Sequence, residues 1–272
     1  MKAMRVVGVL VALVGLAAVS VGGLAQQADR LQTILDRGVI KIGIMLICPP
    51  FGMYDANNQP VGFDVDLANL IAKALNVRLE IVPVLAANRI PYLVTDQVDL
   101  VVGTFSRTAE RELVVDYSVP YVRTGPALMV RATETTINSI ADTAGKRVAV
   151  LKGTTGAIWA KKLAPAGTIF IEYDYEPDQL LALMQGKVDA LVQDETIISG
   201  WMSQYPGQFK IVGDLFFNDY ICIGLKQGLE TYNLKNWLNW FLFELHNTGV
   251  IEELWNKWFS IPMRPVEQNP FF

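Results

Sequence analysis

Short apolar runs alternate with amphipathic segments along the first part of the chain. Residues 39–44 (VIKIGI) predict a buried strand, and residues 64–75 carry apolar side chains at helical spacing on one face. Further strands are expected at 77–82 and 99–102, and short helical segments at 90–93 and 108–113. This alternation of strand and helix predicts a sheet covered by helices on both faces.

A second set of similar segments begins near Pro126. Residues 139–142 (SIAD) resemble a capping box that opens a short helix, which stops at Gly145. Residues 234–259 predict a helix broken near Gly249, and we interpret its tryptophans as core packing. Strands are expected at 127–130, 147–151, 169–173, 189–193 and 221–225, and helices at 157–163 and 178–185.

The two sets share a sub-pattern, VDLVV at residues 98–102 and VDALV at residues 188–192. Each run forms a predicted strand and leads into a loop rich in polar groups. Loops at the carboxyl ends of strands in two similar α/β lobes place a ligand in the crevice between the lobes. The pattern therefore predicts a two-lobed α/β protein with its binding site between the lobes.

The first 25 residues have the three-part pattern of a secretory signal peptide. Lys2 and Arg5 supply a positive start, and residues 6–21 are apolar and uncharged. We expect cleavage after Ala25, with Ala28 as the second choice. The alternative is an uncleaved membrane anchor, which is disfavoured because the run is shorter than the ~20 residues that span a bilayer comfortably. Removing the signal changes the formal net charge from −4 to −6.

Composition excludes several classes of protein. With 51% hydrophobic and 18% charged residues, the 272-residue chain can build substantial cores and is not a disordered protein. Its acidic balance argues against a nucleic-acid partner. The single histidine, His246, disfavours histidine-rich metal sites and catalytic triads, and we expect no metal and no cofactor. Export would permit a disulfide between Cys48 and Cys222, although two unpaired thiols are the preferred interpretation.

An ordered series of short motifs resembles the extracellular solute-binding proteins of bacterial polar amino-acid ABC transporters (family 3). The motifs are PPF at 49–51, VGFDVDLA at 61–68, NRIP at 88–91, SRTAER at 106–111, DYSVPY at 116–121, GKRVAV at 145–150, GTT at 153–155 and VDA at 188–190. The resemblance runs from about residue 31 to residue 259 and so covers nearly the whole mature chain.

The resemblance implies a periplasmic-binding-protein type II (Venus-flytrap) fold, in which each of two lobes has a mixed sheet flanked by helices. The first lobe would comprise residues 26–124 and 219–272, and the second would be residues 125–218. Two hinge strands would join the lobes near residues 123–125 and 217–219.

A free α-amino acid is a zwitterion, and a site that encloses it has to meet both charges. The resemblance identifies Arg111 as the arginine for the α-carboxylate, because a guanidinium offers two parallel donors. The alternative is a surface arginine paired with Glu110, Glu112 or Asp116. Asp194 ends a predicted buried strand and is the candidate for the ammonium group; its alternative role is the N-cap of the next helix.

Further candidate contacts come from both lobes. Ser106 would meet the carboxylate or the ammonium group, Thr155 the carboxylate, and Thr104 the ammonium group. Arg89 matches a position that glutamate- and aspartate-type relatives use for a side-chain carboxylate, which favours an acidic or polar ligand; the alternative is a solvated arginine at a helix start. The remaining expected lining residues are Gly103, Leu151, Thr154, Met45, Cys48 and Ala86, of which the last three make this wall smaller and less aromatic than in many relatives.

The resemblance implies a periplasmic protein, not an enzyme, that captures a free amino acid and delivers it to ABC permease subunits, and we expect it to be monomeric. Its contact with the membrane would be made only through the permease. Two alternatives stay open. One is an enzyme on the same scaffold, such as a cyclohexadienyl-dehydratase-like protein using Glu172, Glu176 or Glu195 as general acid. The other is a protein that presents its ligand to a chemoreceptor.

Overall fold

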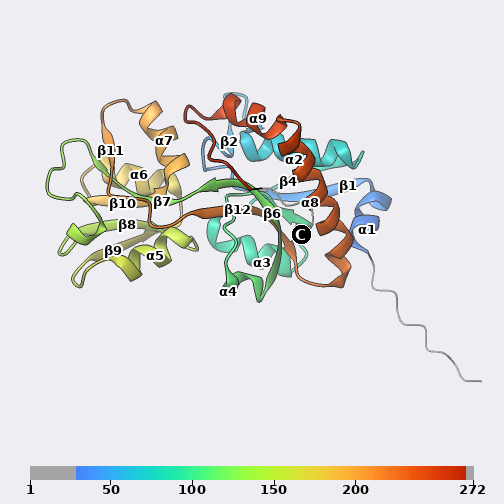
Figure 1. Cartoon of the computed structure of the whole chain (residues 1–272), viewed down its shortest axis with the longest axis horizontal. Coiled ribbons are helices and arrows are strands. Elements are labelled where there is room, and N and C mark those ends of the chain that lie inside the picture. Colours follow the sequence, from blue (N-terminus) through green and yellow to red (C-terminus); the bar gives the residue numbers. More distant parts are fainter. Residues whose placement is uncertain (1–28, 268–272) are drawn as a thin grey trace, which may run out of the picture.

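The computed structural model describes residues 29–267, which form two lobes side by side along the long axis of the molecule (Figure 1). The predicted signal peptide lies outside these residues. Within the described part of the chain, no helix combines the length and apolar character needed to cross a bilayer. Each lobe is built on a five-stranded mixed sheet, as the sequence predicts.

The sheet of the first lobe has the strand order β4-β1-β5-β12-β6. Helices α2 and α8 pack on one face through residues such as Leu67 and Leu238, and α3 packs on the other face through Leu93. The elements of this lobe are α1 (Arg30–Arg37), β1 (Val39–Ile44), β2 (Met53–Tyr54), β3 (Pro60–Val61), α2 (Phe63–Ala74), β4 (Arg78–Pro83), η1 (Ala86–Asn88), α3 (Arg89–Val94), β5 (Leu100–Val101), α4 (Ala109–Glu112), β6 (Val115–Thr124), β12 (Asp219–Lys226), η3 (Leu229–Thr231), α8 (Tyr232–Asn247) and α9 (Val250–Trp258).

The sheet of the second lobe has the order β11-β7-β10-β8-β9. Its elements are β7 (Pro126–Arg131), η2 (Ile140–Asp142), β8 (Arg147–Leu151), α5 (Thr155–Leu163), β9 (Ile169–Tyr173), α6 (Glu176–Met184), β10 (Ala190–Asp194), α7 (Glu195–Gln204) and β11 (Phe209–Val212). The predicted strands at 147–151 and 169–173 agree with the structure residue for residue. Ser139 caps η2 with the expected capping box.

The chain crosses between the lobes twice. It leaves the first sheet after Thr124 and enters the second at Pro126, and it returns to the first sheet at Asp219. Strands β6 and β12 run antiparallel from the pair Thr124 and Asp219 to the pair Val115 and Lys226. These two paired strands reach from the first lobe to the second (Figure 1).

The VDL and VDA motifs perform the same structural task in both lobes. The Asp99 carboxylate accepts a hydrogen bond from the backbone N–H of Lys41 at 2.7 Å and pairs with Arg37. In the second lobe the Asp189 carboxylate accepts from the backbone N–H of Arg147 at 2.8 Å and pairs with its guanidinium. Each aspartate therefore ties the start of one strand to the start of its parallel neighbour, at the sheet edge opposite the ligand loops.

The two cysteines are buried and unbonded, in agreement with the preferred interpretation of the sequence. Cys48 lies in the loop after β1, and Cys222 packs on the α3 side of the first sheet. Burial raises the pKa of both thiols. Because the reactive form is the thiolate, both groups are expected to be chemically quiet in the folded protein.

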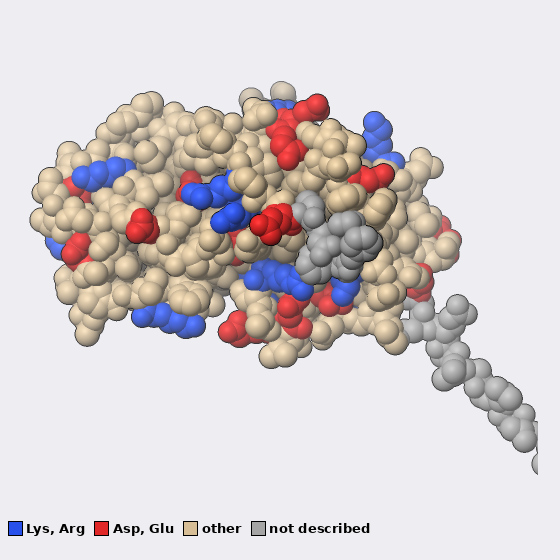
Figure 2. Space-filling model, viewed as in Figure 1, with Lys and Arg blue, Asp and Glu red and all other residues tan. Residues whose placement is uncertain are grey.

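Basic and acidic side chains lie interspersed on the face of the molecule shown in Figure 2, with wide uncharged areas between them. That face carries no continuous basic tract of the kind that binds a phosphate backbone.

Replacing Asp99 by alanine should destabilise the first lobe. The change leaves the Lys41 N–H without its carboxylate partner and Arg37 without its ion pair, so the free energy of unfolding should fall by about 1–3 kcal/mol. Urea unfolding measures the change. The exposed Asp214, replaced by asparagine, is the matched control and should lie within about 0.5 kcal/mol of the parent; equal stability of both variants would contradict the structural role of Asp99.

Candidate functional site

A small cavity lies between the lobes, where strand ends of the two sheets face each other. Its interior of about 10 Å³ is close to the space that one water molecule needs, so the surrounding side chains enclose it tightly. The first lobe contributes Met45, Ala86, Arg89, Thr104 and Ser106, and the second Leu151, Thr154, Thr155, Gly156, Glu176, Gln193, Asp194 and Ile197.

The cavity brings together most of the residues that the sequence singled out. Three of them do not line it. Cys48 is buried behind the wall, Gly103 contributes its carbonyl to Arg89, and Arg111 lines an adjoining hollow that shares Thr155 with the cavity. Four lining residues were missed as ligand contacts: Gly156, Glu176, Gln193 and Ile197.

A chain of hydroxyl groups links the lobes at one end of the cavity. The Thr155 hydroxyl donates to Oδ2 of Asp219 at 2.7 Å, and Oγ of Ser106 lies 3.2 Å from the same hydroxyl. Either hydroxyl group can be the donor in the contact between Ser106 and Thr155. Asp219, at the start of β12, was not predicted, because nothing in its local sequence marks a contact with another lobe.

Arg111 also spans the lobes. Thr108 caps α4 by accepting from the Arg111 N–H, and the guanidinium donates to the carbonyl of Ser106 at 2.7 Å and to that of Gly153 at 2.8 Å. Among residues 29–267 it forms no ion pair: Glu112 pairs with Arg107, and Asp116 pairs with Lys235. The guanidinium is therefore held by carbonyl groups, which leave its positive charge unneutralised.

Arg89 is buried, with 2% of its surface exposed, so the alternative of a solvated arginine at a helix start is wrong. Its guanidinium donates to four backbone carbonyls, those of Ala86, Gly103, Thr104 and Gly153, at 2.7–3.2 Å. Burial, together with the nearby charge of Arg111, lowers the pKa of Arg89 to about 10. Four of its five N–H groups are thus engaged by the main chain.

Asp194 stands at the N-cap position of α7, but its side chain accepts no capping hydrogen bond from that helix. The backbone N–H of Asp194 donates a hydrogen bond to Oε1 of Gln193 at 3.1 Å. Burial and the neighbouring charge of Asp219 raise the pKa of the Asp194 carboxyl. The N-cap role therefore applies to the backbone only, and the carboxylate is left available to a cation in the cavity.

Glu176 is the most deeply buried carboxyl group in the cavity wall. Only 1% of its surface is exposed, and neither carboxylate oxygen has a hydrogen-bond partner among the described residues. Burial raises the pKa of Glu176 to about 7, although its own backbone N–H, the charge of Arg89 and the nearby Cys48 thiol oppose the rise. The sequence considered Glu176 only as a general acid, because its place at the start of α6 does not reveal that it faces the first lobe.

The backbones of the two lobes come close together at Gly153, after β8. Its φ is +76°, and a Cβ atom there would lie 2.8 Å from Cα of Ala87 in the first lobe. Both the backbone conformation and the contact require glycine at this position. The Gly153 carbonyl accepts from Arg89 and Arg111, so one peptide group of the second lobe contacts both arginines.

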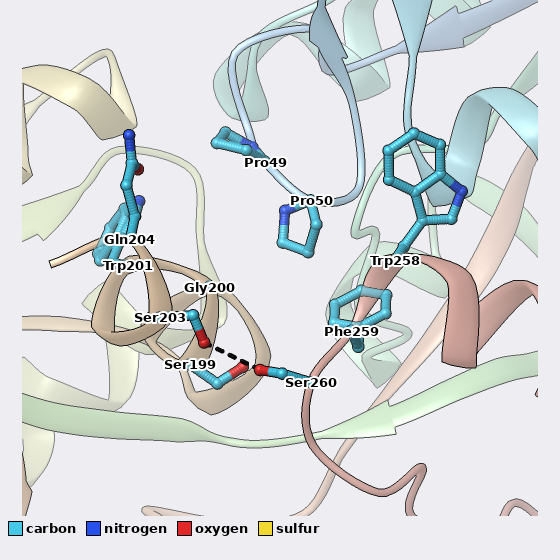
Figure 3. Close-up of a pocket in the computed structure, with 10 residues that line it drawn as sticks. All are labelled: Pro49, Pro50, Ser199, Gly200, Trp201, Ser203, Gln204, Trp258, Phe259 and Ser260. Carbon is cyan, nitrogen blue, oxygen red and sulfur yellow. Dashed lines mark hydrogen bonds between the residues drawn. The ribbon is translucent and has the colours of Figure 1, made fainter. Parts of the chain in front are cut away.

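A second hollow between the lobes, of about 210 Å³, lies between α7, Pro49–Pro50 and the segment after α9 (Figure 3). All ten residues that line it are uncharged, so it lacks groups to neutralise a zwitterion. Ser203 and Ser260, which both line it, contact each other with their hydroxyl oxygens 2.9 Å apart (Figure 3). Beyond it, Arg264 pairs with Glu195 of α7. The segment after α9 thus contacts the second lobe.

Within residues 29–267, no cluster of three or more His, Cys, Asp and Glu side chains is arranged to hold a metal ion. The charged groups of the cavity are one buried arginine and two carboxyl groups, with Arg111 and Asp219 at its edge. Such a set can bind a small molecule that carries both charges, by ion pairing and hydrogen bonding.

The chain is similar to known amino-acid-binding proteins over most of its length. The L-cystine-binding protein TcyJ of Escherichia coli (strain K12) is 28% identical over 255 residues, which cover 92% of this chain and 95% of the relative. An ancestral arginine-binding protein, solved with glutamine bound, superposes with a TM-score of 0.77 at 34% identity, covering 83% of this chain and 99% of the other.

A third similarity is to an ancestral amino acid-binding protein described as a precursor of cyclohexadienyl dehydratase. It superposes with a TM-score of 0.79 at 30% identity and covers 85% of this chain and 100% of that one. Residues 40–261 match the family of bacterial extracellular solute-binding proteins, family 3. The two-lobed fold and this match agree with the resemblance found in the sequence, and the chain belongs to family 3 of the bacterial extracellular solute-binding proteins.

Proposed function

We propose that the protein captures a free amino acid in the cavity between its lobes and delivers it to an ABC permease. The observation that carries the proposal is the half-buried Asp194 carboxylate, which makes no capping bond, in a cavity that also holds the hydroxyl groups of Ser106 and Thr155. Relatives named for cystine, glutamate, glutamine and arginine binding support the same class of ligand.

The two ends of the amino acid would be met at different places. The ammonium group would pair with Asp194 and donate a hydrogen bond to the hydroxyl oxygen of Thr104. The carboxylate would lie near Ser106 and Thr155, where the first turn of α5 also presents backbone N–H groups. Arg111 would reach it by exchanging a carbonyl acceptor for the carboxylate, a change that replaces a neutral partner with a charged one.

Closure of the lobes would couple binding to transport. Ser106 and Arg111 belong to the first lobe, and Thr155 and Asp194 to the second, so a ligand touching all four binds the closed form better than the open form and shifts the equilibrium toward it. The moving units would be residues 26–124 with 219–272 and residues 125–218, and the hinges would lie near 123–125 and 217–219. A closed, monomeric protein in the periplasm would then dock on the permease.

The alternative of a dehydratase on this scaffold has one point in its favour. Of the three glutamates considered as general acids, Glu172 pairs with Lys161 and Glu195 pairs with Arg264, whereas Glu176 lines the cavity with a pKa near 7. Incubation with arogenate or prephenate separates the two functions. We expect no aromatic product, and catalytic formation of one would replace the transport function by an enzymatic one.

Calorimetric titration with the twenty amino acids tests the proposed function. We expect at least one to bind, and Arg111→Ala or Asp194→Asn to weaken its binding by about 2–5 kcal/mol, because each change leaves one charge of the enclosed ligand unpaired. The exposed residues Arg78 and Asp214, changed to alanine and asparagine, are the matched controls. Unchanged affinity in the two site variants would remove Arg111 and Asp194 from the site, and a panel without any binding would remove the function.

Closure itself can be tested at Gly153. Gly153→Ala places a Cβ atom against the Ala87 backbone only when the lobes are together, so affinity for every ligand should fall by about tenfold or more. Gly145→Ala is the control, since Gly145 also has a positive φ, of +72°, but no atom within 4 Å of an added Cβ. Calorimetry and small-angle scattering compare the variants; equal affinity in both would show that the contact does not limit closure.

A further inference from the structure

The cavity wall contains two buried polar groups that have no partner and no assigned role. Both oxygens of Glu176 and the Nε2 atom of Gln193 lack hydrogen-bond partners among the described residues. Both side chains are at least nine-tenths buried, at 1% and 5% exposed, and both line the cavity. Unsatisfied polar groups at such depth are rare in folded proteins, and in a cavity they mark positions where a ligand completes the hydrogen bonding.

The other polar side chains of the wall are already engaged. Thr154 donates to the carbonyl of Leu151 at 2.8 Å, and Thr104 donates to the sulfur of Met45 at 3.5 Å. Thr155 and Ser106 belong to the hydroxyl chain, and Asp194 is the partner proposed for the ammonium group. Glu176 and Gln193 are therefore the groups left to recognise the ligand's side chain.

The charges in the wall argue against an acidic side chain. Arg89 was the reason to favour an acidic ligand, yet four of its five N–H groups are committed to backbone carbonyls. A ligand carboxylate would instead face the carboxyl group of Glu176 without a free guanidinium to separate the two. An N–H donor would supply what Glu176 lacks.

We propose that Glu176 determines specificity and that the ligand is an amino acid whose side chain ends in N–H donors, a carboxamide or a cation, and not a carboxylate. The proposal rests on the proposed function, since it assigns the α-amino and α-carboxylate groups to Asp194 and to Arg111 with Ser106 and Thr155. A carboxamide satisfies both free groups, because its NH₂ donates to Glu176 and its carbonyl accepts from Nε2 of Gln193. A guanidinium or ammonium group satisfies Glu176 alone.

The apolar part of the cavity suits the stem of such a side chain. Met45, Ala86, Leu151 and Ile197 line it and offer no hydrogen-bond donor in their side chains. Methylene groups packed there would be removed from water, which is favourable, and would displace no hydrogen bond of these side chains. The polar end of the ligand would then be the part that Glu176 and Gln193 discriminate.

The test measures dissociation constants of glutamine, arginine, lysine, glutamate and norvaline for the mature protein and for Glu176→Gln. Norvaline keeps an aliphatic stem but has no polar end. For the parent we expect glutamine, arginine or lysine to bind roughly 10- to 100-fold more tightly than glutamate and norvaline. In Glu176→Gln the favoured ligand should lose most of that advantage, while glutamate should gain affinity because the like charge is gone.

Glu172→Gln is the matched control, because Glu172 is exposed and outside the cavity, and it should leave all five constants unchanged. A preference of the parent for glutamate, or an equal loss for every ligand in Glu176→Gln, would overturn the role of Glu176 while leaving the amino-acid-binding function intact. Absence of binding for all amino acids would instead reject the proposed function itself. Glutamine binding more tightly than arginine and lysine would identify the carboxamide, and the reverse order the cation.

Discussion

Charge enclosed between two lobes has to be balanced inside the enclosure, because water no longer screens it. In this protein the cavity is lined by Arg89, Asp194 and Glu176, and only the arginine has most of its hydrogen-bonding groups met by the protein itself. The two carboxyl groups have raised pKa values since burial disfavours their ionised forms. A ligand that brings positive charge or N–H donors into this space stabilises both the carboxylates and the closed arrangement that buries them.

The same constraint explains how the lobes meet. The carbonyl of Gly153 accepts from Arg89 and Arg111, and the hydroxyl of Thr155 bridges Ser106 and Asp219. Each contact joins a group of the second lobe to the first through hydrogen bonds that a water molecule or a ligand atom could also make. Such exchangeable bonds hold a closed form without locking it, which suits a protein that has to release its cargo.

Prediction from the sequence succeeded where a polar residue with suitable chemistry stands at a recognisable place in the fold, such as the end of a strand. Asp194 follows a buried strand, and strand ends of an α/β lobe face the crevice, so its place in the cavity could be anticipated. Glu176 opens a helix, and its burial depends on the first lobe lying over it, which no local pattern reports. Arg89 lines the cavity as expected, but its hydrogen bonds to four carbonyls depend on how three separate loops come together.

The sequence by itself determined the strand and helix order and the two lobes, because apolar periodicity acts within each element. It marked the repeated VDL and VDA motifs, but the bonds of Asp99 and Asp189 to neighbouring strands became visible only in the structure. The tertiary structure decided which polar groups remain without partners once the lobes close. That outcome depends on distances between residues far apart in the chain. A buried polar group that no protein group reaches favours a ligand that supplies the missing hydrogen bond. For this reason the sequence, through Arg89, favoured an acidic ligand, whereas the unpartnered Glu176 of the structure favours a ligand with N–H donors.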